Sequence, residues 1–297
     1  MKDLGKVSQC LGLNITRTRN SIMLDQEKYI NEILSRFNMS ECKTVKSPVE
    51  VGLKFSENKE QETFDCPYQQ AIGSLLYVAQ GTRPDISYIV NALSRFNKDP
   101  RSEHWVAVKR VMRYLQGTKG YKLTYTKKGN EEITGYCDAD WASDAHDRKS
   151  CTGYVFMFQG GAISWCSRKQ QTIALSTAEA EYMAMGSAAQ EALWMRQLQS
   201  ELGRGSGTLL IYSDNQSAIK LSANDCYLPR SKHIDIKYHF LKDHVISKEL
   251  KFCYVKGCEN ISDILTKGTT VQKHMYCVTN MGLRSGVDVR NGTQQTS

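Results

Sequence analysis

The sequence predicts an α/β fold, with a mixed sheet flanked by helices and preceded by a mainly helical region. Three observations lead to this prediction. Helical periodicity dominates between residues 68 and 115, strand-like segments follow one another between 123 and 167, and helical and strand-like segments alternate from 177 onward. Antiparallel strands followed by alternating helices and strands are typical of a mixed sheet with helices on its faces.

The first part of the chain predicts a hairpin and several helices. Residues 7 to 38 contain two apolar segments around a polar turn and then apolar residues at helical spacing, which predicts a hairpin followed by a helix. Residues 51 to 66 are polar and lack periodicity, so we expect a linker or an exposed loop. Further helices are expected at 71–80, 84–96 and 105–115. Pro84 fits the first turn of its helix, where a missing amide hydrogen costs little.

The second part predicts the α/β region. Strands are expected at 123–126, 133–140, 152–158, 162–167, 209–213 and 250–254. Helices are expected at 177–202, 216–221, 234–246 and near Asp263. The last residues are rich in Gly, Asn, Thr and Gln, which favours disorder. We therefore expect a first domain at 1–120, a second at 121–270 and a disordered tail at 271–297.

Composition indicates a polyanionic partner. The 297 residues suffice for two domains, and they carry a formal net charge of +8 with a pI near 8.9. Clustered Lys and Arg gain affinity by displacing the counterions of phosphates, so nucleic acid is the expected partner. A soluble protein that is merely basic is the alternative.

The cysteines and the apolar segments point to an intracellular protein. Several of the ten cysteines lie in strand-like segments, such as Cys137, Cys166 and Cys253, and none forms a Cys-x-x-Cys pair with a downstream partner. Reduced thiols are therefore expected. No apolar stretch reaches the roughly 20 residues that span a bilayer, and the first residues do not form a signal peptide. We expect neither secretion nor membrane insertion.

Four acidic residues from different local settings form a candidate metal centre. Asp138 lies on an expected strand, Glu181 enters the long helix, Asp214 ends an apolar run, and Asp263 opens a helix-like stretch. Carboxylates that converge from separate elements repel each other unless divalent cations share them, and hard oxygen ligands suit Mg²⁺. Two such cations about 4 Å apart would clamp a phosphodiester for in-line attack by water.

Two glutamates compete for the place in the long helix. Ser176 and Glu179 have the spacing of a capping box, which makes Glu179 structural. Glu181 falls on the apolar stripe that continues through Met185, so it points toward the sheet and needs a partner or a metal. The alternative is an ion pair between Glu181 and a nearby arginine such as Arg168.

The three aspartates have structural alternatives of their own. Strand alternation puts Asp138 and Asp140 on the same face, so the pattern alone does not separate them. Asp214 lies where an apolar strand ends and a helix begins, a place where ligands gather and where N-caps are common. Asp263 could complement a helix dipole.

A combination of short segments carries a highly specific resemblance. The segments are Tyr136-Cys-Asp-Ala-Asp-Trp-Ala, Arg148-Lys-Ser-Cys-Thr-Gly-Tyr, Ile163-Ser-Trp-Cys-Ser-Arg-Lys-Gln, Ala174-Leu-Ser-Thr-Ala-Glu-Ala-Glu-Tyr, Asp214-Asn-Gln-Ser-Ala, Lys232-His-Ile-Asp-Ile-Lys-Tyr-His-Phe and Asp263-Ile-Leu-Thr-Lys. Together they resemble the C-terminal part of a copia-type retrotransposon Pol polyprotein. In that family the region is the ribonuclease H domain, which cleaves the RNA strand of RNA/DNA hybrids. The resemblance implies a ribonuclease H-like fold and an intracellular location, in a cytoplasmic retroelement particle or the nucleus.

The resemblance also implies roles for individual residues. Asp138, Glu181, Asp214 and Asp263 take the family's four metal-ligand places, which selects Asp138 over Asp140. Two Mg²⁺ ions, with Mn²⁺ as an alternative, are the implied cofactors. Contacts to 2′-hydroxyls would select RNA. Expected contacts to the nucleic-acid backbone are Arg148, Lys149, Arg168, Lys169 and Gln170, and the alternative for each is a solvated side chain.

Many cellular relatives of this fold have a histidine in a mobile loop between the third and fourth acids, where it assists water attack or product release. Residues 254–260 contain none here. His233 and His239 could substitute, and a helix-capping or surface role is the alternative for both. Slow turnover is therefore expected.

The first part of the chain resembles the segment that connects the reverse transcriptase palm to ribonuclease H. The matching segments are Met1-Lys-Asp-Leu-Gly, Tyr68-Gln-Gln-Ala-Ile-Gly-Ser-Leu-Leu-Tyr, Thr82-Arg-Pro-Asp-Ile, His104-Trp and Arg113-Tyr-Leu. Residues 1–120 would thus be a thumb- or connection-like remnant whose partner is the palm, and Met1 would mark a truncated reading frame. The polymerase motif Tyr-x-Asp-Asp is absent from the sequence, so polymerase activity is not expected.

Three other functions remain open at this stage. A decayed, inactive nucleic-acid-binding remnant would not need four clustered acids. An integrase or transposase of the DDE type shares the sheet and the metal chemistry, but its Glu comes last rather than second. A structural subunit that supports a polymerase in trans would depend on a separate palm-bearing chain.

Overall fold

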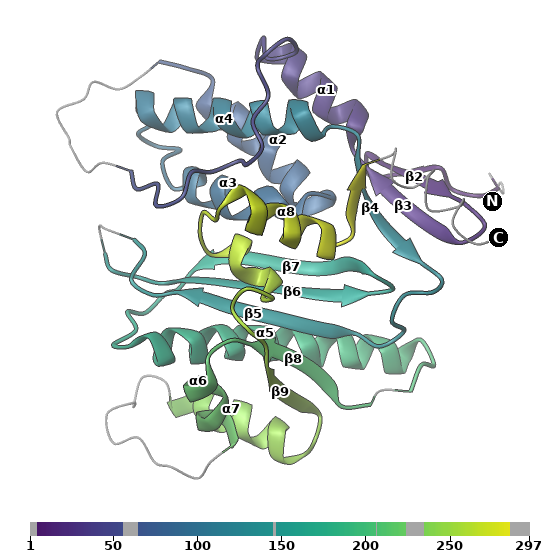
Figure 1. Ribbon diagram of the computed structural model, residues 1–297, viewed down its shortest axis with the longest axis vertical. Helices are drawn as coiled ribbons and strands as arrows, with labels where there is room; N and C mark the ends of the chain where they lie inside the picture. The colour runs from purple at the N-terminus through teal and green to yellow at the C-terminus, as the bar shows by residue number, and fades with distance from the viewer. Residues whose placement is uncertain (1–4, 56–64, 145–146, 206, 224–234, 286–297) are drawn as a thin grey trace. The chain divides into compact units, whose positions relative to one another are not determined.

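The computed structural model describes residues 5–55, 65–144, 147–205, 207–223 and 235–285, which form two compact units (Figure 1). Unit 1 comprises Met1–Gly129, Gln159–Gly161 and Gly268–Ser297, and unit 2 comprises Asn130–Phe158 and Ala162–Lys267. Among the described residues, no helix combines the length and the apolar character that crossing a membrane requires.

Unit 1 combines an antiparallel sheet with a helical core. Its strands are β1 (Gln9–Cys10), β2 (Leu13–Arg17), β3 (Ser21–Asp25), β4 (Tyr121–Thr126) and β10 (Leu283–Ser285), in the order β1-β2-β3-β4-β10. Its helices are α1 (Glu27–Arg36), α2 (Tyr68–Gly81), the 3-10 helix η1 (Pro84–Ile86), α3 (Ser87–Ser94), α4 (Ser102–Thr118) and α8 (Val271–Asn280). The expected hairpin and helices of the first part are thus confirmed, and Pro84 begins η1.

Two expectations about this unit are wrong. The strand expected at 123–126 does not join the α/β sheet, because β4 pairs with β3 on one side and β10 on the other. The tail expected at 271–297 is ordered over its first part, where α8 buries His274, Cys277 and Val278 and β10 completes the sheet. Residues 286–297 lie outside the described residues. The polar composition of this segment suggested disorder. Helix α8 nevertheless has an apolar side, and that side is buried against residues far away in the sequence.

Unit 2 has the expected ribonuclease H-like mixed sheet with flanking helices. The strands β5 (Thr134–Asp140), β6 (Cys151–Phe158), β7 (Gly161–Lys169), β8 (Leu209–Ser213) and β9 (Leu250–Tyr254) lie in the order β7-β6-β5-β8-β9. Strand β5 is antiparallel to β6 and parallel to β8, and β8 is parallel to β9. The strand order reverses beside β5, which is where sites form in open sheets.

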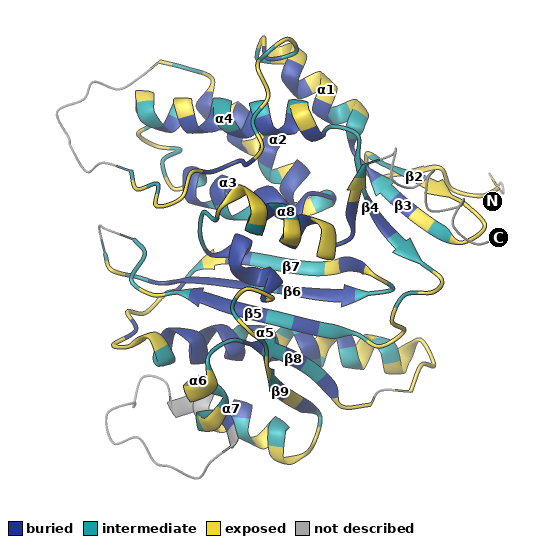
Figure 2. Cartoon of the chain, in the orientation of Figure 1, coloured by how far each residue is buried: buried dark blue, intermediate teal, exposed yellow. Residues whose placement is uncertain are grey.

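The helices of unit 2 also match the sequence prediction. They are α5 (Thr177–Glu201), α6 (Gln216–Ala223), α7 (Asp235–Ile246) and the 3-10 helix η2 (Ile261–Leu265). Helix α5 packs on β5 and β6, and the apolar residues between them form a core that includes Phe156, Met185 and Ile211. Figure 2 shows the resulting burial of β5 and β6. This packing holds the ends of β5 and β8 rigidly in place.

Candidate metal centre

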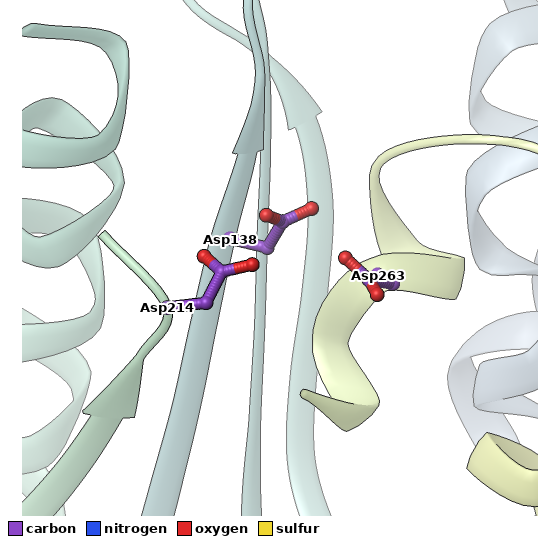
Figure 3. A group of neighbouring side chains, drawn as sticks. All are labelled: Asp138, Asp214 and Asp263. Atoms are coloured by element: carbon purple, nitrogen blue, oxygen red, sulfur yellow. The ribbon is translucent and has the colours of Figure 1, made fainter. Parts of the chain in front are cut away.

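Three aspartates from separate elements of unit 2 converge. Asp138 lies on β5, Asp214 follows β8, and Asp263 lies in η2; one carboxylate oxygen from each lies within 4.8 Å of the others (Figure 3). The sheet register explains two of these positions. Tyr136 pairs with Tyr212 across the parallel strands, and each aspartate comes two residues later. We call these three residues the acidic cluster.

Helix η2 is attached to β5 by Asn260. The Asn260 side chain is completely buried; its Nδ2 donates to the Cys137 carbonyl at 3.0 Å and its Oδ1 accepts from the Ser262 amide at 3.2 Å. One amide thus connects the residue before Asp138 with the turn that carries Asp263. Because both of its hydrogen bonds are buried, either group would be left unsatisfied without it.

A glycine makes room for this turn. Gly153 lies opposite Asp138 on β6, and a Cβ atom at this position would lie only 2.7 Å from Thr266 Cγ2 and 2.8 Å from Leu265 Cβ. Any side chain would therefore push η2 away from the sheet. Gly153 is thus a requirement of the site and not only of the strand.

Two residues that the sequence analysis missed contact the acidic cluster. Lys267 Nζ lies 2.9 Å from Asp263 Oδ1 and 3.2 Å from Asp138 Oδ2. The hydroxyl of Thr266 donates to Asp138 Oδ2. Burial lowers the pKa of Lys267, but Asp138 and Asp263 together raise it above its ordinary value, so the lysine is charged. The i, i+4 spacing of Asp263 and Lys267 was the one available signal.

Asp138 is a buried carboxylate whose ionisation is opposed. Burial, the largest influence, and the charge of Asp263 raise its pKa to about 6, although Lys267 and the Thr266 hydroxyl act in the opposite direction. Its neighbour Asp140 is only partly buried. The structure therefore separates two aspartates that strand alternation left equivalent.

Glu181 lies next to the acidic cluster but outside its closest group. It is 4% exposed on α5, and its Oε2 has no hydrogen-bond partner among the described residues. Burial first, and then the charges of Asp138 and Asp214, raise its pKa to about 9. Arg168, the expected alternative partner, is exposed, and no pairing with Glu181 is found in the described part of the chain.

These residues fit a divalent cation. Neighbouring aspartates raise the pKa values of Asp138 and Glu181, and Glu181 Oε2 has no hydrogen-bond partner in the described part of the chain. A cation of charge +2 would stabilise such a site. All the donors are hard oxygens, as Mg²⁺ and Mn²⁺ prefer.

Residues other than Glu181 and Asp214 cap the helices α5 and α6. Ser176 Oγ accepts from the Glu179 amide at 3.2 Å, and Glu179 Oε2 accepts from the Leu175 amide at 2.8 Å, so Glu179 is structural as expected. At the start of α6, Asn215 Oδ1 accepts from the Ala218 amide at 2.9 Å. Asn215 therefore caps α6, and Asp214 is left for the acidic cluster.

The residues expected to contact nucleic acid have different surroundings. Arg148 and Arg168 are exposed. Lys169 Nζ lies 2.5 Å from Asp144 Oδ2 and 2.8 Å from Asp147 Oδ1, and Lys149 Nζ lies 3.7 Å from Asp147 Oδ2. The charges of the two lysines are thus partly balanced by neighbouring aspartates.

The expectation for Gln170 is wrong. Its side chain is 8% exposed, and Nε2 donates to Thr152 Oγ1 at 3.0 Å and to the Ala180 carbonyl at 2.9 Å. It links β6 to α5 from inside the unit and does not lie at a nucleic-acid surface. The neighbouring basic residues suggested a surface position, but Gln170 follows the end of β7 and its side chain is buried.

The two histidines cannot be treated alike. His239 is exposed on α7. His233 lies outside the described residues. Between β9 and η2, Gly257 approaches the cluster instead, because a Cβ there would lie 3.1 Å from Asp214 Oδ2. The loop before the fourth acid thus brings a glycine to the third acid.

Comparisons with known proteins agree with the sequence resemblance. The chain is 44% identical over 295 residues to the retrovirus-related Pol polyprotein from transposon TNT 1-94 of Nicotiana tabacum, covering 96% of this chain and 22% of that protein. It is 39% identical over 270 residues to the retrovirus-related Pol polyprotein from transposon RE1 of Arabidopsis thaliana, covering 90% of this chain and 18% of that protein. The chain therefore spans about a fifth of the length of these relatives. No family model matches.

Among solved structures, the chain is similar to LC11-RNase H1, isolated from compost. The sequence identity is 14% and the TM-score 0.36, and the match covers 46% of this chain and 94% of that one.

Proposed function

Because this chain belongs to the retrovirus-related Pol polyproteins of copia-type transposons, we propose that unit 2 hydrolyses the RNA strand of RNA/DNA hybrids. The observation that carries the proposal is the convergence of Asp138, Asp214 and Asp263 within 4.8 Å, next to the buried Glu181. A surface that only binds nucleic acid has no use for carboxylates that would repel its phosphates.

The four acids have distinct roles in this proposal. Asp138 and Asp214, with Asp263, would hold one Mg²⁺ ion, and Glu181 would contribute to a second. Bound Mg²⁺ supplies Lewis acidity for water activation and for the leaving 3′ oxygen. Asp138 and Asp214 are held in register by paired strands, so they present their oxygens without reorganisation. Products would carry 5′-phosphate and 3′-hydroxyl ends.

Exposed arginines of unit 2 would suit a polyanionic substrate. Arg148 and Arg168 are exposed on unit 2 and would contact the backbone of the hybrid, together with Lys149 and Lys169. Contacts to 2′-hydroxyls would distinguish the RNA strand.

Unit 1 would be the part that once adjoined a polymerase. Residues 1–120 would be a thumb- or connection-like remnant of the reverse transcriptase, with the palm of a longer polyprotein as partner.

The test is cleavage of a labelled RNA/DNA hybrid in Mg²⁺ or Mn²⁺, with duplex DNA and duplex RNA in parallel. Asp214→Asn should reduce hybrid cleavage about 1,000-fold or more, the scale of a lost transition-state contact. Asp243→Asn is the matched control, because Asp243 is exposed on α7 and is not one of the clustered aspartates.

Hybrid-only cutting that Asp214→Asn abolishes and Asp243→Asn preserves would establish the activity. Binding of the hybrid by the folded wild-type protein without any cutting would contradict it and favour an inactive nucleic-acid-binding remnant.

A further inference from the structure

One cation is already part of the acidic cluster. Lys267 Nζ lies 2.9 Å from Asp263 Oδ1 and 3.2 Å from Asp138 Oδ2, so it contacts two of the three carboxylates. The lysine side chain is 38% exposed, whereas the side chains of Asp138 and Asp263 are 2% and 9% exposed. An ammonium group shared by two buried carboxylates is held by charge-assisted hydrogen bonds and is not a solvated surface charge.

The backbone fixes the lysine in this place. Its amide donates to the Asp263 carbonyl at 3.1 Å, which closes the turn after η2. Thr266, the residue before it, donates its hydroxyl to Asp138. The turn that delivers the Asp263 carboxylate to the cluster therefore delivers the Lys267 ammonium as well.

We propose that Lys267 is a resident cation of the metal centre. Its ammonium group occupies the place between Asp138 and Asp263 that a divalent ion would otherwise share, and Mg²⁺ or Mn²⁺ binds there in competition with it. The inference rests on the proposed function, because it takes the aspartates to be metal ligands. Repulsion between an ammonium group and a divalent ion a few ångströms apart weakens the binding of that ion.

The lysine has two consequences that can be measured without any activity. In the metal-free protein it balances part of the carboxylate charge and so stabilises unit 2. In the presence of metal it opposes binding. A lysine that is only structural would give the first effect and not the second.

The experiment compares full-length wild type with Lys267→Gln, Lys267→Arg and Lys251→Gln at pH 8. Lys251→Gln is the matched control, since it removes the same charge from an exposed position on β9. Thermal unfolding is followed in EDTA, and Mn²⁺ binding is followed by calorimetric titration.

We expect Lys267→Gln to lower the Tm in EDTA by roughly 3–6 °C. We also expect it to lower the half-saturating Mn²⁺ concentration about tenfold or more. Lys267→Arg keeps the charge, so it should stay near wild type, as should Lys251→Gln. Unchanged or weaker Mn²⁺ binding by a folded Lys267→Gln would overturn the inference.

Two further outcomes separate the possible failures. If Lys267→Gln does not fold, the double variant Lys267→Gln with Asp263→Asn decides. Removing one partner carboxylate should restore a folded protein, and a double variant that also fails to fold would overturn the inference. If neither wild type nor any variant binds Mn²⁺ at millimolar concentration, the metal centre itself is wrong and the proposed function fails with it.

Discussion

Each unit of this protein buries a group of ionisable side chains, and the two groups are opposites. In unit 1, Arg83 and Asp85 are fully buried 2.7 Å apart, and the Tyr114 hydroxyl donates to Asp85 Oδ2 at 2.7 Å. Although burial raises the pKa of Asp85, Arg83 holds it below its ordinary value. In unit 2, burial and neighbouring acids raise the pKa values of Asp138 and Glu181.

The difference teaches how to tell a structural charge from a functional one. The guanidinium group of Arg83 donates hydrogen bonds to Asp85 and also to Thr118. It bonds to the Thr118 carbonyl at 3.1 Å and to Thr118 Oγ1 at 2.7 Å. The acidic cluster instead has more carboxylates than cations. A buried ion pair with balanced charges and satisfied hydrogen bonds needs no further ligand, so it is structural. Buried carboxylates that outnumber the neighbouring cations indicate a cation-binding site.

Removing Arg83 would break the balance in unit 1 and should have the largest effect on stability. Arg83→Met leaves Asp85 buried without its counter-ion, so we expect a loss of about 3–5 kcal/mol in the free energy of unfolding. Urea unfolding at pH 7 measures it. Arg36→Met on the exposed surface of α1 is the control and should change stability little.

The double variant Arg83→Met with Asp85→Leu sharpens this result. Removing both charges leaves an apolar site, so much of the lost stability should return. If the double variant were as unstable as Arg83→Met, packing and not charge balance would hold this part of unit 1.

The two units should respond to pH in opposite directions when no metal is bound. Burial lowers the pKa of His274 to about 4, so unit 1 favours the neutral form and loses stability as pH falls from 6.5 toward 4. The depressed pKa of Asp85 acts in the same direction at lower pH. Asp138, with its pKa raised to about 6, binds its proton more tightly when folded, so unit 2 loses stability as pH rises from about 4 to 6.

The pKa of Glu181, raised to about 9, extends the loss in unit 2 toward that pH. The effects of His274 and Asp138 should each reach roughly 3 kcal/mol. Urea midpoints between pH 4 and 9 in EDTA, resolved by unit with pulsed hydrogen exchange, would show the two trends. Parallel trends in both units would refute the contrast.

Asn260→Ala tests whether geometry as well as charge distinguishes the acidic cluster. Loss of its buried hydrogen bonds should cost about 1–3 kcal/mol and weaken Mn²⁺ binding about 10- to 100-fold. Asn280→Ala is the matched control, because Asn280 donates to the Tyr276 carbonyl at 2.8 Å from an exposed position on α8. Full Mn²⁺ affinity in a folded Asn260→Ala would show that η2 positions itself without this contact.

Local patterns point to Asp214 and Glu181, whereas the choice of Asp138 over Asp140 came only from the family resemblance. Asp214 follows the apolar strand β8, Asp138 lies within β5, and the stripe of α5 turns Glu181 inward. The contacts that hold the site could not be predicted this way. Asn260 bonds to a carbonyl 123 residues away, and no periodicity reports such a partner.

The same reason explains the errors in unit 1. The sequence of strand β4 has the same strand-like pattern as the strands that follow it. Only its pairing with β3 and β10 shows that it belongs to another sheet. Helix α8 brings His274 to Tyr114, 160 residues earlier in the chain. Local sequence predicts an element's type, whereas long-range packing decides which sheet or core it joins.

His274→Phe should have the smallest effect on stability. It removes the neutral histidine that contacts Tyr114, beside the buried pair of Arg83 and Asp85. Tyr114 donates to Asp85, so His274 Nε2, 3.0 Å from the Tyr114 oxygen, is the donor. Its loss should cost about 1 kcal/mol at pH 7, because Arg83 and Tyr114 still satisfy Asp85. It should also remove the fall in unit 1 stability between pH 6.5 and 4.

His239→Phe, exposed on α7, is the control. If the acid-side loss persisted in His274→Phe, it would arise from Asp85, and the balance in unit 1 would depend on the carboxylate alone.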